Sequence, residues 1–327
     1  MRLAVLISFL VYFSINTYSQ EYRFSQFYQY PVILNPALTG LAKNLRVTSG
    51  YKIFPDTGSA AKQVYLSNVE MTFFNEKRKK IFIGGGGGAM YDKNFIGQQQ
   101  KYEVSLSSAF HLILNDKNSI SSGVYTAVIR KKVTVANDKY AEFSYTDIAS
   151  GIQWDYSKAE QYFSANNNLN FNLGFAMFHL NRPHTNFSVS KQRVKPAFQI
   201  HSMAYIGILA TSISVIPAFS YFNNGYYSEL MIGTNVKYYL SGQSQYAGNL
   251  KNKVFLIGGL FKYNSVLNDY FVTTIYFELG EVGLGISYDY NLLETNKIAD
   301  NYNALEVSVI FIHHKGYSYN SKIRKWE

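Results

Sequence analysis

The segment Val282–Tyr290 reads VGLGISYDY, and its residues alternate strictly in character. Every second residue, starting at Val282, is apolar or aromatic, whereas the residues between them are Gly, Gly, Ser and Asp. Successive side chains of a β-strand point to opposite faces of its sheet. The segment therefore predicts a strand with one apolar face and one small, polar face.

The same alternation recurs along most of the chain. It is clear in residues 101–114, in residues 228–240 and again in residues 304–313. Turn residues such as Asn223-Asn224-Gly225 separate these segments. The pattern predicts fourteen strands, near residues 45–54, 62–73, 80–91, 101–114, 118–130, 147–156, 169–179, 197–209, 212–222, 228–240, 252–263, 269–279, 282–291 and 304–313. Residues 133–145 and 181–195 read as longer loops.

The composition favours a membrane barrel over other all-β folds. Aromatic residues make up 17% of the chain and charged residues only 16%, yet the mean hydropathy of −0.12 is too polar for a bundle of membrane helices. Strands of about ten residues with an apolar and a polar face suit a transmembrane antiparallel β-barrel of the bacterial outer membrane, which has an even number of strands. A secreted soluble β-sandwich is the alternative, because apolar and polar residues also alternate along its strands.

One uncharged stretch, Ser202–Ser228, is long enough for a membrane helix. Gly207 and Pro217 interrupt it, and β-branched and aromatic residues are frequent in it. We therefore expect two strands with a tight turn near Thr211.

The N-terminus predicts export. Arg2 precedes the apolar run Leu3–Phe13, and Thr17 and Ser19 are small residues before Gln20, which is the pattern of a cleaved secretory signal peptide. We expect a signal peptide at residues 1–19, an N-terminal plug or arm at residues 20–44 and the barrel at residues 45–327. The expected location is the outer membrane, so lipids of that membrane are expected partners and nucleic acid is not.

Catalytic and cofactor signals are weak. The chain has no Cys, and its six His residues form no H-E-x-x-H motif. His313 and His314 are adjacent in a strand and face opposite sides, so they cannot chelate one ion. We expect no catalytic residues, no cofactor and no metal. The net charge of +10 gathers in runs such as Lys77–Lys80, which fit solvated turns or contacts with acidic partners or lipid phosphates.

Five consecutive glycines, Gly84–Gly88, follow an apolar Ile-Phe-Ile. No Gly-Lys-Ser/Thr follows them, so they do not form a phosphate-binding loop. Glycines inside a strand mark a bend or the close approach of another backbone. They fit a wall that admits an inner segment, and equally a simple kink of the barrel.

The stretch Phe24–Gly40 reads FSQFYQYPVILNPALTG. It resembles the start of the PorP/SprF family, in which an F-S-Q-aromatic element is followed by Pro and then N-P-A-x-x-G. Three later segments are also similar to the family: FNLGFAMFHLNRPHTNF at 171–187, GTNVKYYL at 233–240 and GLGISYDYNLL at 283–293. The family positions, as expected structural or partner contacts, are Phe24, Ser25, Gln26, Phe27, Asn35, Pro36, Ala37 and Gly40, then Gly174, His179, Asn181, Pro183, Tyr288, Asp289, Tyr290 and Glu306.

The chain also departs from the family. Leu305 stands where a His is common, and the segment Lys315–Glu327 follows the last alternating segment, which leaves the position of the closing strand open.

The resemblance implies a non-enzymatic barrel of the type IX secretion system of Bacteroidetes. Its expected partners are a secreted cargo protein or the C-terminal domain of that cargo, such as a large adhesin of gliding motility, and subunits of the secretion machinery. The alternative is a diffusion channel or a transporter of hydrophobic solutes.

The residues of Phe24–Gly40 suit a plug inside the lumen. Asn35 can cap a helical turn, Pro36 is favoured at the first position of that turn, and Gly40 can end it. We expect Ser25, Gln26 and Gln29 to contact the wall, and Phe24, Phe27 and Tyr28 to pack against wall glycines. An ordered arm outside the barrel is the alternative.

Overall fold

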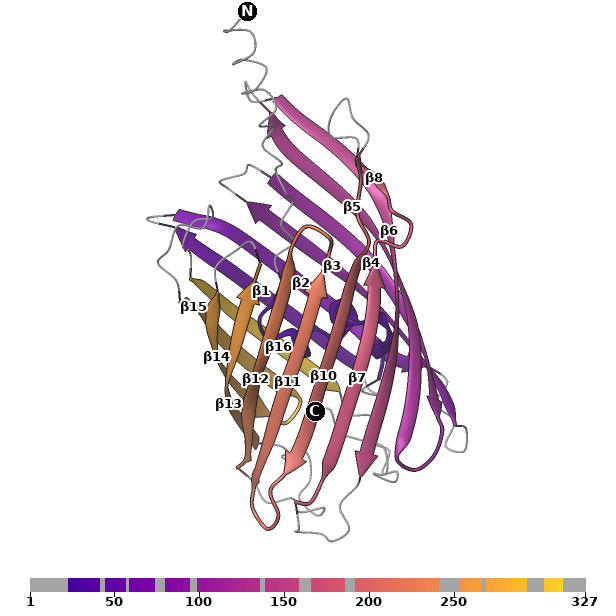
Figure 1. Ribbon diagram of the computed structural model, residues 1–327, viewed down its shortest axis with the longest axis vertical. Helices are drawn as coiled ribbons and strands as arrows, with labels where there is room; N and C mark the ends of the chain where they lie inside the picture. The colour runs from indigo at the N-terminus through magenta and orange to yellow at the C-terminus, as the bar shows by residue number, and fades with distance from the viewer. Residues whose placement is uncertain are drawn as a thin grey trace, which may run out of the picture.

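The computed structural model is a closed antiparallel β-barrel (Figure 1). It describes residues 23–41, 45–56, 59–73, 80–94, 99–135, 139–158, 166–185, 192–240, 253–265, 269–292 and 303–313. The predicted signal peptide lies outside these residues, so its cleavage stays a prediction. No helix in this part of the chain is long and apolar enough to cross a membrane.

Within the described residues, fourteen strands form the wall, and each pairs with its neighbours in an antiparallel register. Their bounds are β1 Leu45–Asp56, β2 Ser59–Phe73, β3 Ile81–Asn94, β4 Gln99–Ile113, β5 Asn118–Val135, β6 Lys139–Lys158, β7 Leu169–Phe178, β10 Ala197–Gly207, β11 Ile213–Asn223, β12 Ser228–Tyr239, β13 Lys253–Asn264, β14 Tyr270–Leu279, β15 Val282–Asn291 and β16 Ala304–His313. The sequence-based count of fourteen is confirmed.

The barrel closes between β1 and β16. Leu45 pairs with His313 at one end of this seam, and Ile53 pairs with Leu305 near the other. The closing strand is therefore β16. Both ends of the wall-forming chain lie at the end of the barrel that carries Leu45 and His313, which we call the terminal end.

The faces of the wall are arranged as the alternation predicts. On β4 the apolar side chains of Val104 and Leu106 are 65% and 66% exposed, whereas Ser105 and His111 face inward and are buried. If the outer face were in water, each exposed Leu or Val would lose the favourable free energy of burial, about 1.5–3 kcal/mol. An apolar outer face over a polar lumen instead matches a barrel surrounded by lipid. A soluble sandwich would bury the apolar face, so that alternative is excluded.

Two regions differ from the sequence-based boundaries. Residues 133–145 were expected to be a loop, but β5 continues to Val135 and β6 begins at Lys139. These two strands are the longest, at 18 and 20 residues, and project beyond their neighbours (Figure 1). Within the expected loop at 181–195, β8 (His184–Thr185) and β9 (Gln192–Arg193) pair as a short antiparallel sheet.

The uncharged stretch Ser202–Ser228 forms two strands, as expected. The end of β10 turns into β11, and in this turn the N–H of Ile208 donates to the carbonyl of Ile213 at 3.0 Å. The N–H of Thr211 also donates to the carbonyl of Ile208 at 3.1 Å, which places the tight turn where it was expected.

Candidate functional site: a plug in the lumen

Residues 23–41, which we call the plug, lie inside the barrel and have most of their side chains buried. The plug contains three short helical turns, η1 (Phe27–Gln29), α2 (Pro31–Leu34) and η2 (Pro36–Leu38). Proline at the first position starts both α2 and η2, since its fixed φ suits a helix and its missing N–H would have no partner there. The plug is thus compact and satisfies many of its own backbone groups.

Asn35 caps η2 as expected. Its Oδ1 accepts from the N–H of Ala37 at 2.9 Å, and its Nδ2 donates to the wall carbonyl of Ile152, also at 2.9 Å. Gly40 ends the plug with a φ of +68°, a conformation that a residue with a side chain rarely adopts. The Asn35 side chain therefore both shapes the plug and fixes it to β6.

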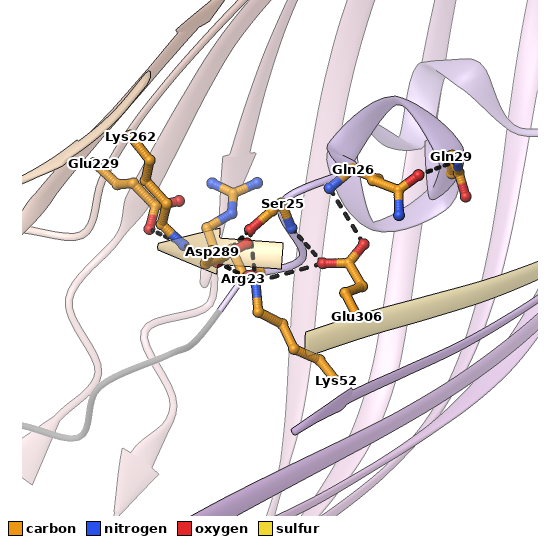
Figure 2. A network of polar contacts seen from close by, with 9 residues as sticks. All are labelled: Arg23, Ser25, Gln26, Gln29, Lys52, Glu229, Lys262, Asp289 and Glu306. Carbon is orange, nitrogen blue, oxygen red and sulfur yellow. Dashed lines mark hydrogen bonds and ion pairs between the residues drawn. The ribbon is translucent and has the colours of Figure 1, made fainter. Parts of the chain in front are cut away.

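A buried network of charges fixes the first half of the plug to the wall (Figure 2). The backbone N–H of Ser25 donates to Glu306 at 2.6 Å, and the Ser25 hydroxyl donates to Asp289 at 2.6 Å. The Lys52 ammonium donates to the Ser25 hydroxyl at 2.6 Å and to Asp289 at 2.9 Å. These four residues are at most 1% exposed. Strands β1, β15 and β16 thus converge on a single plug residue.

The network continues in both directions. The N–H of Gln26 donates to the second oxygen of Glu306 at 3.2 Å, so that one carboxylate holds two consecutive plug amides. On the other side, Lys262 pairs with Glu229 at 3.3 Å and lies 3.9 Å from Asp289. Burying charges costs several kcal/mol each unless partners and hydrogen bonds compensate, so this network is sensitive to the loss of any member.

A second group of contacts holds the end of the plug near the terminal end of the barrel. The N–H of Gly40 donates to Glu70 at 2.8 Å, and the hydroxyl of Thr72 donates to the carbonyl of Gly40 at 2.7 Å. One ring nitrogen of His111 lies 2.9 Å from the carbonyl of Thr39. The plug is therefore attached to the wall near both of its ends.

Glycines in the wall make room for the plug. A Cβ at Gly50 would lie 2.7 Å from the Tyr30 ring, and one at Gly84 would lie 2.9 Å from the Cα of Gly40 and overlap Thr39. Both are well inside van der Waals contact. The wall glycines that would meet plug atoms in this way come from β1, β3, β5, β6 and β15, and are Gly50, Gly84, Gly123, Gly151 and Gly285.

The apolar side chains of the plug pack differently from the expectation. Phe24 lies with Tyr30 against Val64 and Leu66, while Phe27 packs into a separate cluster with wall side chains that include Met231. The expectation that Phe24, Phe27 and Tyr28 pack against glycines is therefore wrong. The plug atoms nearest to the wall glycines come from the side chains of Tyr30, Asn35, Gln26 and Gln29 and from the backbone of Pro36, Ala37, Thr39 and Gly40. Burial raises the pKa of the Tyr30 phenol, and the nearby Glu306 carboxylate raises it further.

A family model described as "Type IX secretion system membrane protein PorP/SprF" matches residues 16–311. The chain belongs to this family. No curated protein sequence matches the chain.

Several solved outer-membrane barrels resemble the structure at low similarity. A Pseudomonas aeruginosa FadL homologue aligns with a TM-score of 0.49 and 9% identity, over 86% of this chain and 93% of that one. The Ralstonia pickettii toluene transporter TbuX aligns with a TM-score of 0.48 and 9% identity, over 86% and 92%. The translocator domain of the autotransporter NalP from Neisseria meningitidis gives 0.37 and 10%, over 82% and 88%. At this similarity they carry no argument about function.

The N-terminal PorP/SprF motif lies within the plug. Phe24, Ser25, Gln26, Phe27, Asn35, Pro36 and Ala37 are all buried, and Gly40 is held between β2 and β3. The structure accounts for these residues as internal contacts of the barrel, and a role for them in binding a partner stays a prediction.

The other PorP/SprF motif positions divide among three places. Asp289 and Glu306 face the lumen in the charge network, whereas Tyr288 and Tyr290 are 40% and 57% exposed on the outer face. Gly174 faces the lumen beside His201 and Gln153, where a Cβ would overlap both side chains.

The third group follows β7. His179 pairs with Asp147 at 2.9 Å, Asn181 donates to the carbonyl of Thr146 at 2.6 Å, and the carbonyl of Pro183 accepts from Val194 at 3.0 Å. The motif after β7 therefore shapes the connection to β8.

Sequence reasoning missed Lys52, Lys262, Glu229 and Glu70. Each is a single charge at a lumen-facing position of an alternating strand, as in Tyr-Lys-Ile around Lys52. An inward charge in a narrow lumen needs a partner, so this signal was present in the sequence. Among the described residues, no group of His, Asp and Glu side chains could hold a metal ion.

Proposed function

We propose that this barrel is a non-enzymatic outer-membrane component of the type IX secretion system that partners the secretion or surface attachment of particular cargo proteins, such as large adhesins. The cargo, or its C-terminal domain, is the expected partner, together with subunits of the secretion machinery. Membership of the PorP/SprF family supports the link to this system. The apolar outer face supports a place in a membrane.

The observation that carries the proposal is the plug, which is attached to the wall at both ends. Ser25 and Gly40, near its two ends, are bound to Glu306 and Glu70 on different strands. A diffusion channel needs a continuous wet path, whereas an anchor for another protein does not. A fixed plug therefore favours a binding partner over an open pore.

Affinity purification tests this proposal directly. The protein, tagged at a surface loop, is extracted from native outer membranes and its companions are identified by mass spectrometry, with an unrelated barrel carrying the same tag as control. We expect a stoichiometric surface protein, or subunits of the secretion machinery, that the control does not retain. A barrel that is recovered alone and conducts ions would contradict the proposal and support the alternative, a diffusion channel or hydrophobic-solute transporter.

A further inference from the structure

A cavity of about 120 Å³ lies in the lumen beside the plug. The plug and the wall form it jointly, and the wall residues that line it include Phe178, the last residue of β7, and Phe222, near the end of β11. These two strands run so that Phe178 and Phe222 lie away from the terminal end. The cavity therefore belongs to the opposite end of the barrel.

The lining of this cavity differs from the rest of the lumen. Lumen-facing positions elsewhere are often small or polar, as on β4 and β15. The cavity is bordered by Ile33, Leu34, Met90 and Ile129, by aromatic rings, and by the charged or polar side chains of Arg23, Lys101, Glu103, Asp147 and His179. The rings come from the plug and from three strands, and are Phe24, Phe27, Tyr30, Tyr125, Phe178 and Phe222.

The charged groups at the cavity are already paired with protein partners. Lys101 contacts Glu103 at 2.8 Å, and Asp147 contacts His179 at 2.9 Å. Arg23 donates to Gln199 and lies 4.2 Å from the centre of the Phe222 ring. A charged ligand would lose its hydration here and compete with these existing pairs, so the site suits a neutral group.

Size and lining together select the ligand. A cavity of about 150 Å³ lined by apolar side chains binds benzene, and this cavity is close to that size. Aromatic rings prefer other rings in offset or edge-to-face contact, which adds about 0.5–1.5 kcal/mol to simple burial. We propose that this cavity is a binding site for one uncharged aromatic ring.

The ring has two possible sources, a free aromatic solute or an aromatic side chain of a polypeptide, and the experiment separates them. Toluene represents the first source and N-acetylphenylalanine amide the second. Binding of each is measured by titration calorimetry on the barrel in lipid nanodiscs, with empty nanodiscs subtracted to remove partition into lipid. Methylcyclohexane tests the preference for a ring, and benzoate and benzylamine test the preference for a neutral group.

Two variants locate the binding. Met90→Trp fills the cavity, and Met177→Trp makes the same change on the outer face, where Met177 is 37% exposed. We expect Met90→Trp to weaken binding at least tenfold and Met177→Trp to leave it unchanged. If Met90→Trp does not fold, as judged by its melting temperature, Ile33→Trp fills the cavity from the plug side.

The outcomes are distinct. Saturable binding of toluene alone assigns the site to a free solute, and binding of the amide assigns it to a polypeptide side chain. We expect methylcyclohexane, benzoate and benzylamine to bind at least tenfold more weakly than the better aromatic probe. The proposal is overturned if neither aromatic probe binds beyond empty nanodiscs, if the cavity-filling variant binds as well as the parent, or if methylcyclohexane or the charged probes bind equally well.

Discussion

Replacing Lys52 by Met tests whether the charge network holds the plug. The Lys52 side chain is 1% exposed and contacts Asp289 at 2.9 Å and Glu306 at 3.4 Å. Met has a similar length and no charge, so the change keeps most of the volume. With Lys262 and Glu229, the five side chains carry a formal charge of 2 − 3 = −1, which the substitution changes to −2.

The magnitude follows from burial. Removing one partner of a buried ion pair costs about 3–5 kcal/mol, because the remaining charge stays buried without compensation. The carboxylates regain water if the plug undocks, so the cost appears as a higher population of the undocked state. Each 1.4 kcal/mol is about tenfold in an equilibrium constant. We therefore expect undocking to increase between about 100-fold and several thousand-fold.

A single introduced cysteine reports undocking, because the chain has none of its own. Gln26 is fully buried, and its side chain accepts a hydrogen bond from Gln29 within the plug, so Gln26→Cys leaves the wall contacts in place. When reclosing is fast, the rate of maleimide labelling is proportional to the population of the open state. Labelling of the Gln26→Cys variant should therefore be slow. Adding Lys52→Met should make it faster by about 100-fold to several thousand-fold.

Two variants make the result specific. Lys117→Met makes the same chemical change at an exposed turn and should leave the labelling rate unchanged. Adding Asp289→Asn to Lys52→Met returns the formal charge to −1 and should recover part of the protection. Equal labelling of Lys52→Met and Lys117→Met would refute the idea that the network holds the plug.

Three further predictions concern the plug and the wall. Gly84→Ala should lower stability by about 1–3 kcal/mol through overpacking against the plug, seen as a lower melting temperature. Gly87→Ala on the outer face, where a Cβ would lie no closer than 3.2 Å to another atom, should cost less. Asn35→Ala should cost about 0.5–2 kcal/mol in denaturant unfolding, and Asn35→Ser should recover part of this because Ser also caps helices. Val104→Arg should lose about 2–4 kcal/mol of folding free energy in lipid vesicles while Val104→Leu stays near the parent, since an arginine there would face hydrocarbon. If the two variants of a pair lose the same stability, the feature that the pair tests is contradicted: the approach of the plug to Gly84, the cap made by Asn35, or the exposure of Val104 to lipid.

The wall was predictable because alternation is a local property. β15 and β16 have the predicted boundaries, residues 282–291 and 304–313. Residues 133–145, which were predicted as a loop, contain the consecutive polar residues Asn137, Asp138 and Lys139, a typical turn sequence. Strands β5 and β6 project beyond the neighbouring strands (Figure 1). This turn sequence resembles a long loop, although residues 133–135 pair with residues 139–141 as strands.

The charge network was not predictable in the same way, because it depends on register between distant strands. Lys52 is directly paired with Glu306 across the closing seam, more than 250 residues away in sequence. Alternation assigns each residue to a face but does not say which residues of two strands lie side by side. The glycine run shows the same limit. Gly84 admits the plug, whereas the atoms nearest to a Cβ added at any of the other four belong to the wall.

If the plug closes the lumen, single-channel recording in planar lipid bilayers should show it. The purified wild-type barrel should insert without ohmic conductance steps, and a variant lacking Phe24–Gly40, if it refolds, should give steps under the same conditions. Regular conductance steps from the intact protein would contradict the account, because they would show a continuous path past the plug.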